Sequence, residues 1–196
     1  MTHTIALYGG DFNPPGFHHR TIVEEIADYF DEVIIIPSGP RADKPRSHIA
    51  PMHRAVMITA TFSGIDNVTI DYSDLSREDF TRTFDLDRRF AERGERWHVV
   101  GSDLVVGGRR NESQIHGWYR GEEIWYNFNL AVVMRSGFPI AVQDVPPCGK
   151  VFTGVHFPMS STLIRHRLAK GLPIKHLLVP AVEHYIKKNS LYIKRA

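Results

Sequence analysis

The segment of residues 8–20 reads YGGDFNPPGFHHR, and most of the predicted fold and function depends on it. Gly9 and Gly10 would let a ligand approach the backbone closely. The helix expected after the prolines offers unpaired amides and the positive end of its dipole, which together favour a phosphate. His18 and His19, in its first turn, would add N–H donors for phosphoryl oxygens. An ordinary tight turn with two surface histidines fits the same residues.

Strand and helix patterns alternate along the rest of the chain. Continuous apolar runs, typical of strands buried on both faces of a parallel sheet, occur at residues 5–8, 32–37, 68–71, 97–101 and 130–134. Apolar residues at helical spacing predict helices at 22–30, 51–62, 80–92, 160–170 and 180–189. This alternation predicts an α/β fold, a doubly wound and mostly parallel sheet with C-terminal helices. Loops 38–48 and 106–116 then leave the carboxyl ends of strands, where such sheets bind ligands.

Composition limits the class of protein. Of the 196 residues, 42% are apolar and 23% charged, so we expect one globular domain over residues 1–196. With 24 basic and 22 acidic residues, nucleic-acid binding is disfavoured. No apolar run reaches the roughly 18 residues of a membrane span, and the first residues lack a signal-peptide pattern. A single cysteine, Cys148, excludes an internal disulfide and a multi-cysteine metal site. We expect a cytoplasmic protein without a membrane partner.

A second motif lies near the C-terminus, where residues 158–165 read PMSSTLIR. Ser160, Ser161 and Thr162 would surround a helix N-terminus, a natural site for a polyphosphate. Arg165, one turn further along, is suited to a bidentate contact with phosphate. A serine cap before an ordinary amphipathic helix is the alternative interpretation.

Taken together, the two segments resemble the two signatures of the nucleotidylyltransferase superfamily, and most of all those of the bacterial nicotinate-nucleotide adenylyltransferases. The first signature, Gly-Gly-(Thr/Ser)-Phe-(Asp/Asn)-Pro before His-x-Gly-His, is matched by Gly9, Gly10, Phe12, Asn13, Pro14 and His19. The second, Ile-Ser-Ser-Thr-x-Ile-Arg, matches residues 159–165 with Met159 in place of isoleucine. The resemblance covers nearly the whole chain, and it is loosest over residues 107–114.

Two departures from the first signature matter. The first signature histidine falls on Gly16, and the signature glycine falls on His18. Losing one donor from a phosphate site would raise the barrier by about 2–4 kcal/mol unless another group replaces it. His18 is the candidate replacement, although successive helical residues point about 100° apart. Asp11 stands where the family has a hydroxyl; repelling phosphate, holding Mg²⁺ and orienting His18 remain open for it.

The resemblance also implies roles for residues between the signatures. Residues 101–103 resemble a family Gly-(Ala/Ser)-Asp segment after a strand. There Asp103 would accept hydrogen bonds from ribose hydroxyls or hold Mg²⁺ through water, unless it caps the next helix. Trp118 is expected to stack on a pyridine ring, with a half-buried structural tryptophan as the alternative. Thr81 would line the mononucleotide side.

We therefore predict a Rossmann-like enzyme that transfers AMP from ATP, bound with Mg²⁺, to nicotinate or nicotinamide mononucleotide and releases pyrophosphate in NAD biosynthesis. A sister transferase with another phosphorylated acceptor, and a nucleotide-binding homologue without turnover, are the alternatives that Gly16 and Asp11 leave open. The expected sites are His18, His19 and Arg165 for catalysis; Gly9, Gly10, Asp11, Phe12, Gly101, Asp103, Ser160, Ser161 and Thr162 for ATP; and Lys44, Thr81, Trp118 and Arg135 for the acceptor.

Overall fold

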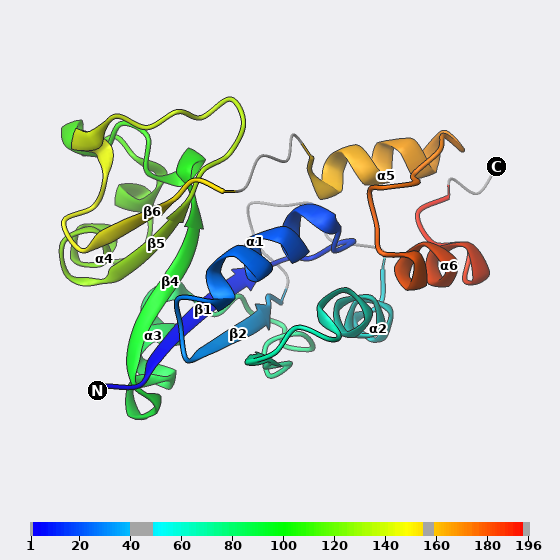
Figure 1. Cartoon of the computed structure of the whole chain (residues 1–196), viewed down its shortest axis with the longest axis horizontal. Helices are drawn as coiled ribbons and strands as arrows, with labels where there is room; N and C mark the ends of the chain where they lie inside the picture. The colour runs from blue at the N-terminus through cyan, green and yellow to red at the C-terminus, as the bar shows by residue number, and fades with distance from the viewer. Residues whose placement is uncertain (1, 40–48, 155–158, 194–196) are drawn as a thin grey trace.

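A single parallel sheet forms the centre of the molecule (Figure 1). The computed structural model describes residues 2–39, 49–154 and 159–193. In this part of the chain the strand order is β3-β2-β1-β4-β5-β6, and every neighbouring pair is parallel. The strands are β1 (Thr4–Gly10), β2 (Glu32–Pro37), β3 (Val68–Ile70), β4 (Glu95–Gly101), β5 (Asn129–Val133) and β6 (Gly149–Phe152). From β1 to β3 each strand is added on one side of β1, and the chain then crosses to the other side of β1 to form β4, β5 and β6. The carboxyl ends of β1 and β4, where this order reverses, are the expected ligand position.

Helices cover both faces of this sheet and extend beyond one edge of it. They are α1 (Phe17–Ala27), α2 (Pro51–Phe62), α3 (Thr83–Arg89), α4 (Gly121–Asn127), α5 (Ser161–Ala169) and α6 (Pro180–Lys188). Proline occupies the first turn of α2 and of α6, where its missing N–H removes no helical hydrogen bond. The Ser160 side chain caps α5 by accepting from the Leu163 amide at 3.2 Å.

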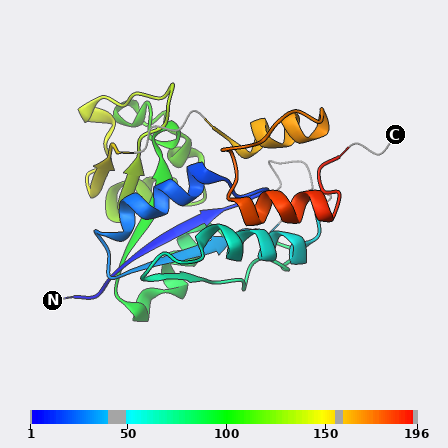
Figure 2. The same ribbon diagram turned by 45° about the vertical axis from the view of Figure 1, so that its right-hand side comes forward.

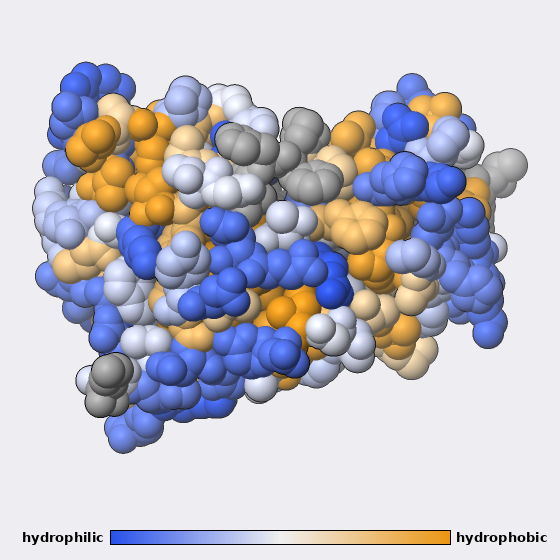
Figure 3. Space-filling view, viewed as in Figure 1, coloured by the Kyte–Doolittle hydropathy of each residue, from blue (hydrophilic) through white to orange (hydrophobic). Residues whose placement is uncertain are grey.

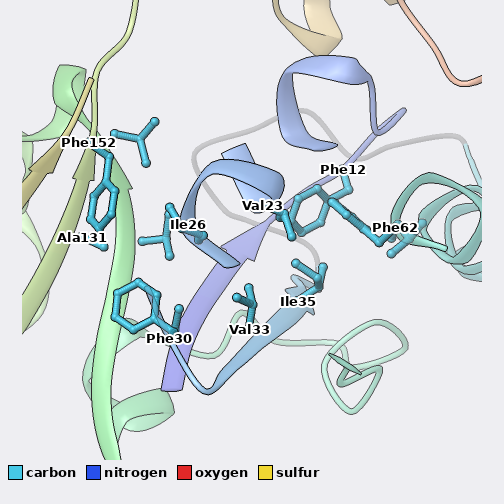
Figure 4. Packing of buried hydrophobic residues seen from close by; sticks show 13 residues of the cluster. Phe12, Val23, Ile26, Phe30, Val33, Ile35, Phe62, Ala131 and Phe152 are labelled. Carbon is cyan, nitrogen blue, oxygen red and sulfur yellow. The ribbon is translucent and has the colours of Figure 1, made fainter. Parts of the chain in front are cut away.

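Successive residues of the strands supply the two faces of the core. On one face, Ala6, Val33, Ile35, Val99 and Ala131 pack against Val23, Ile26 and Phe30 from α1 and the turn after it (Figure 4). On the other face, Ile5, Leu7, Ile34 and Ile36 pack against Leu86 and Phe90 from α3 and its end. Because β2 is buried on both faces, its isoleucines form a continuous run without polar alternation.

A separate apolar cluster joins α2, α5 and α6 beside the sheet. It contains Met57, Ile164, Leu178, Val182 and Ile186. Figure 2 shows α6 lying along α2, while α5 lies above them. This cluster carries the residue 160–165 segment to the same end of the sheet as the turn after β1. The face seen in Figure 3 is mostly hydrophilic over α1, and apolar side chains gather between α5 and α6.

The predicted elements agree with the structure except at four places. The helix predicted for 22–30 is α1 (Phe17–Ala27), which begins five residues earlier and ends three residues earlier. All five predicted strands are present, and α2 has the predicted bounds. The helix predicted for 80–92 is shorter, because Arg82 is extended with ψ 153° and a short 3₁₀ turn at 91–93 follows α3. Neither β6 nor α4 was predicted from the sequence. None of the described helices has the length and apolar content needed to cross a membrane.

Candidate functional site

The turn after β1 is built around a buried aromatic ring. Phe12 is 1% exposed, and its ring centroid lies 5.3 Å from that of Tyr8, 4.9 Å from His19 and 5.8 Å from Phe62. In Figure 4 the Phe12 ring points into the core towards Phe62. Its φ of 45° lies in the left-handed region, which costs roughly 1–2 kcal/mol for a non-glycine residue. Burial of the ring offsets that cost, so Phe12 holds the turn rather than contacting a ligand with its side chain.

The two glycines before Phe12 have different reasons for lacking a side chain. A Cβ on Gly10 would lie 2.9 Å from the Phe12 ring, so Gly10 permits the packing of the turn. A Cβ on Gly9 would meet nothing within 4 Å. Gly9 is also exposed, so its backbone is open to close approach by another molecule.

A backbone contact fixes the tautomer of His19. The Gly16 amide donates to Nδ1 of His19 at 3.1 Å, at the first turn of α1. Nδ1 must carry a lone pair to accept this hydrogen bond, so the hydrogen of the neutral ring lies on Nε2. His19 therefore presents an N–H donor at the tip of its ring.

His18 lies directly against His19. The two ring centroids are 3.8 Å apart, and His18 is 9% exposed. Its Nδ1 is buried and finds no hydrogen-bond partner among the described residues. Burial, with a smaller contribution from the charge of Arg135, lowers the pKa of His18 to about 4. The ring is therefore neutral at pH 7.

Asp11 is paired with a buried arginine that the sequence analysis did not single out. Nη2 of Arg54 lies 3.4 Å from the Asp11 carboxylate, and Arg54 is only 5% exposed. Its guanidinium also donates to the Asp11 carbonyl, at 3.0 Å from Nε and 2.6 Å from Nη2, and to the Ser38 carbonyl at 2.8 Å. The carboxylate that replaces the family hydroxyl thus has a cation beside it, which reduces repulsion of a nearby phosphate.

The carboxyl end of β4 contributes an ion pair. Oδ2 of Asp103 lies 2.9 Å from Nη1 of Arg135, and Oδ1 of Asp103 is buried with no partner in the described residues. A Cβ on Gly101 would clash with Asp103 Oδ1 and lie 2.7 Å from Cδ of Arg135, so the pair requires glycine there. Ser102 Oγ accepts from the Arg135 amide at 2.9 Å and donates to the Phe138 carbonyl at 2.8 Å.

Arg135 links this ion pair to the turn after β1. Burial raises the pKa of Tyr8, and Arg135 opposes that effect while Asp103 adds to it. The same Arg135 acts with burial to lower the pKa of His18. Residues of β1, of α1 and of the segments after β4 and β5 therefore share one electrostatic environment at the switch point of the sheet.

The second motif lies against the first. Ser161 Oγ donates to the Pro14 carbonyl at 2.8 Å, and Nη1 of Arg165 donates to the Asn13 carbonyl at 2.6 Å. Nη2 of Arg165 also donates to Thr162 Oγ1 at 3.0 Å. The two segments that resemble the family signatures are thus in direct contact. Ser161 and Arg165 hold the turn after β1 through these hydrogen bonds.

The C-terminal tail reaches the same turn. The Tyr192 hydroxyl donates to Oδ1 of Asn13 at 2.5 Å, and burial raises the pKa of Tyr192. No role in the site was predicted for this tail. No local pattern marks Tyr192 as different from the other tyrosines, so the contact was not predictable from spacing.

The expected acceptor residues lie on two neighbouring segments. Thr81 Oγ1 accepts from Nη2 of Arg89 at 3.3 Å. The next residue, Arg82, places its guanidinium carbon 4.6 Å from the centroid of the Tyr119 ring. Trp118, adjacent to Tyr119, is partly buried against the cluster around α4. Thr81 and Trp118 are thereby brought to the same side of the molecule, whereas Lys44 lies outside the described residues.

Comparison with known proteins identifies the class that this fold and site define. A family model described as cytidylyltransferase-like matches residues 7–167, which include both motifs. The chain belongs to this cytidylyltransferase-like family of nucleotidyltransferases. Within it, two curated relatives are each described as a probable nicotinate-nucleotide adenylyltransferase, as the motifs predicted.

Relatives of this kind align over almost the whole chain. A probable nicotinate-nucleotide adenylyltransferase of Kineococcus radiotolerans is 30% identical over 191 residues, covering 94% of this chain and 88% of the relative. Its counterpart in Borrelia hermsii is 28% identical and covers 97% and 98%. Nicotinic acid mononucleotide adenylyltransferase from Plasmodium falciparum, solved in complex with NaAD, has a TM-score of 0.78 at 24% identity, with 97% of each chain covered. This structural likeness confirms the α/β Rossmann-like fold.

Proposed function

We propose that this protein transfers the AMP part of Mg²⁺-ATP to nicotinate mononucleotide and releases pyrophosphate. One observation carries the proposal: residues 9–19 and 160–165 meet at the carboxyl end of β1, joined by the Ser161–Pro14 and Arg165–Asn13 hydrogen bonds. The likeness to nicotinate-nucleotide adenylyltransferases over at least 94% of the chain supports the choice of acceptor. A cytoplasmic location belongs to the same proposal.

The reaction requires little covalent chemistry from the protein. The acceptor phosphate attacks the α-phosphorus of ATP in line, and pyrophosphate leaves. We assign to His19, with His18 beside it, the contacts to the phosphates around the reacting phosphorus. The exposed Gly9 backbone lets the nucleotide come close. These groups act by positioning and by stabilising charge that develops in the transition state.

We assign the outer phosphates of ATP to the start of α5, and the metal ion to Asp103. Thr162 is exposed and Arg165 is half-buried, so both are accessible at the start of α5. Asp103 suits the Mg²⁺ that accompanies ATP, because its Oδ1 lacks a partner in the described residues and hard cations prefer oxygen ligands. Bound Mg²⁺ would neutralise charge on the leaving pyrophosphate.

The acceptor would lie on the Thr81 and Trp118 side. Trp118 is partly buried, so part of its ring is available for stacking on a pyridine. Arg135 and Lys44 complete the proposed acceptor site as cations for the incoming phosphate. The exposed Arg82 and Tyr119 are the chain neighbours of Thr81 and Trp118, and the Arg82 guanidinium lies over the Tyr119 ring.

Product analysis tests this function. The purified protein is mixed with Mg²⁺-ATP and, in separate reactions, with nicotinate mononucleotide, nicotinamide mononucleotide or buffer. Pyrophosphate together with a dinucleotide peak from the nicotinate reaction is the expected result. If only the reaction with nicotinamide mononucleotide gives a dinucleotide, the acceptor is nicotinamide mononucleotide and not nicotinate mononucleotide.

A second candidate is a sister transferase with another phosphorylated acceptor. Two features favour this candidate, because both alter the turn proposed to lie closest to the phosphates. One is the exchange of the signature histidine and glycine, which places Gly16 and His18 there. The other is the Asp11–Arg54 pair. ATP binding measured by calorimetry, with no product from either mononucleotide, would support this candidate. ATP binding with no turnover on any phosphorylated acceptor would indicate a binding protein instead.

A further inference from the structure

Residues 71–82 join β3 to α3 and include Thr81, on the side of the molecule where we place the acceptor. No helix or strand forms within this segment, all of which the structure describes. The sheet holds it at its first residue, where the Asp71 amide donates to the Ile35 carbonyl at 2.9 Å. Because β3 has three residues and lies at the sheet edge, the rest of the segment depends on other contacts.

The Arg89 side chain, at the end of α3, contacts this segment at three places. Its Nη2 lies 2.7 Å from Oδ1 of Asp74 and donates to Thr81 Oγ1 at 3.3 Å. Its Nη1 lies 3.6 Å from Oδ2 of Asp71. Asp74 is 1% exposed, and a carboxylate buried to this degree is costly unless a cation lies beside it. One guanidinium thus links the beginning, the middle and the end of the segment.

The backbone of the same segment packs tightly on the end of β2. A Cβ on the buried Gly39 would lie 2.9 Å from the carbonyl oxygens of Asp74 and Asp79. The carbonyl oxygen of Arg77 would lie 3.3 Å from it. The segment therefore rests on β2 through its backbone, and its carboxylates depend on Arg89 for their ion pairs.

The contact with Arg89 decides how the Thr81 hydroxyl can form hydrogen bonds. A guanidinium can only donate, so Thr81 Oγ1 is the acceptor in this contact. The hydroxyl hydrogen is left to donate, and it has no acceptor among the described residues. Thr81 is partly exposed, so it offers this donor to a molecule that binds beside it.

We propose that Arg89 is a positioning residue of the acceptor site. It fixes the place of Thr81 and orients the hydroxyl so that it donates to an oxygen of the bound mononucleotide. This inference rests on the proposed function for the identity of its ligand. Arg89 acts through Thr81, since its own charge is held by Asp71 and Asp74. A donor that is fixed before the ligand arrives loses little conformational freedom on binding.

Steady-state kinetics of Arg89→Gln test this role. The KM for the mononucleotide is expected to rise about tenfold or more, as for the loss of a charge-assisted contact, while the KM for ATP stays within about twofold. Arg93→Gln is the matched control, because it breaks a 2.7 Å pair with the buried Glu32 at the start of β2. The control should lose stability but keep both KM values. An unchanged mononucleotide KM in Arg89→Gln, or an equal rise in the two variants, would overturn the proposal.

Arg89→Lys covers the case in which glutamine prevents folding. Lysine keeps a cation beside Asp74, but its single ammonium group does not reproduce the fork that also reaches Thr81. Stability close to that of wild type, together with a raised mononucleotide KM, is expected. A wild-type KM in this variant would mean that charge alone suffices and that Arg89 does not position Thr81.

A double-mutant cycle separates action through Thr81 from general support of the fold. If Arg89 acts through Thr81, the Arg89→Gln change adds little once Thr81→Val has removed the hydroxyl. The doubly substituted protein should then have a mononucleotide KM within about twofold of that of Thr81→Val alone. Increases that multiply in the double variant would contradict action through Thr81.

Amide hydrogen exchange of the full chain without substrate tests the anchoring of the segment. Amides of residues 72–81 are expected to exchange faster in Arg89→Gln than in wild type or Arg93→Gln, because local opening of the segment then costs less free energy. Equal exchange in the three proteins would overturn the proposal.

The two proposals fail in different ways. If wild type gives no dinucleotide with either mononucleotide, the proposed function is wrong, and hydrogen exchange still decides whether Arg89 anchors the segment. If dinucleotide forms and Arg89→Gln keeps the wild-type mononucleotide KM, the role of Arg89 is wrong and the proposed function stands.

Discussion

The Tyr192 hydroxyl donates a hydrogen bond of 2.5 Å to Oδ1 of Asn13, a residue 179 positions earlier in the chain. Arg165 bonds the carbonyl of the same Asn13, and Ser161 bonds that of Pro14. The turn that would bind the nucleotide is therefore held from outside by the C-terminal part of the chain. Its own sequence does not supply these contacts.

Tyr192→Phe is expected to weaken both the fold and the turn. It removes one hydrogen bond and leaves the buried Asn13 oxygen with one donor fewer, so the free energy of unfolding should fall by about 1–2 kcal/mol. The KM for ATP should rise because the turn is held less firmly. Urea unfolding and steady-state kinetics measure the two effects. Tyr185→Phe is the control: its hydroxyl contacts His53 on α2 at 2.9 Å, so it should leave KM unchanged. Equal KM values for the two variants would contradict this role of Tyr192.

Arg54→Met should destabilise the protein strongly. The change leaves the Asp11 carboxylate without its cation and the Asp11 and Ser38 carbonyls without their donor. Breaking a buried pair of this kind costs about 3–5 kcal/mol, and the partial exposure of Asp11 places the expected loss at the lower end. Arg110→Met, which breaks the exposed pair with Glu112, should change the free energy of unfolding by less than about 1 kcal/mol. Chemical denaturation of both variants compares them, and similar losses would show that Arg54 is not structural.

Gly9→Ala should separate binding from stability. The added methyl group meets nothing within 4 Å, and Gly9 has no positive φ, so the midpoint of thermal unfolding should stay the same or rise slightly. The same methyl group would stand where we expect a nucleotide to approach, so the affinity for ATP should fall at least tenfold. Calorimetric titration measures it. Gly117→Ala, equally open and outside both motifs, should bind ATP normally. Unchanged affinity in Gly9→Ala would place the nucleotide elsewhere.

The folded protein should lose stability between pH 6.5 and 4 because of His18. Burial lowers the pKa of His18 from 6.5 to about 4, so the unfolded chain binds a proton in this interval that the folded chain does not. Stability therefore rises with pH through the interval and is lost as pH falls, by a few kcal/mol from this residue. Urea unfolding of wild type and His18→Gln from pH 4 to pH 7 should show a steeper pH dependence in wild type. Parallel curves would mean that His18 is protonated as easily in the folded state.

His19→Ala should remove most of the activity without removing the fold. One donor lost from a preorganised phosphate site reduces kcat by about a hundredfold to a thousandfold. The loss of the Gly16 hydrogen bond should lower the free energy of unfolding by only about 1 kcal/mol. Pyrophosphate release and circular dichroism follow the two quantities. Full turnover in this variant would exclude His19 from catalysis.

Sequence patterns predicted the centre of the fold better than its edge. The isoleucines of β2 and the helical spacing of 51–62 are long, unmixed signals, and both elements have the predicted bounds. The four-residue β6 lies at the sheet edge and includes the exposed Lys150, so it carries no apolar run. The seven-residue α4 is too short for its periodicity to be distinct from a loop.

The site was predictable only where its residues sit in motifs. The glycines, the histidines and the 160–165 segment have defined neighbours and spacing, so their resemblance to a family was recognisable. Arg54 and Tyr192 act through contacts with residues 43 and 179 positions away, and nothing beside them in the sequence marks this. The ion pair of Asp103 with Arg135 likewise depends on the pairing of β4 with β5.

Ser161, Arg165 and Tyr192 form hydrogen bonds to the turn after β1. A newly made chain can therefore complete its nucleotide site only after these later residues have been synthesised. Residues 9–16 emerge from the ribosome early, but their braces come from the last fifth of the sequence. At roughly 5–20 residues per second, translation leaves this turn incomplete for many seconds. A nascent chain can therefore pair β1 with β2 long before it can hold a nucleotide, and loss of the residues around Tyr192 would affect a site at the opposite end of the gene.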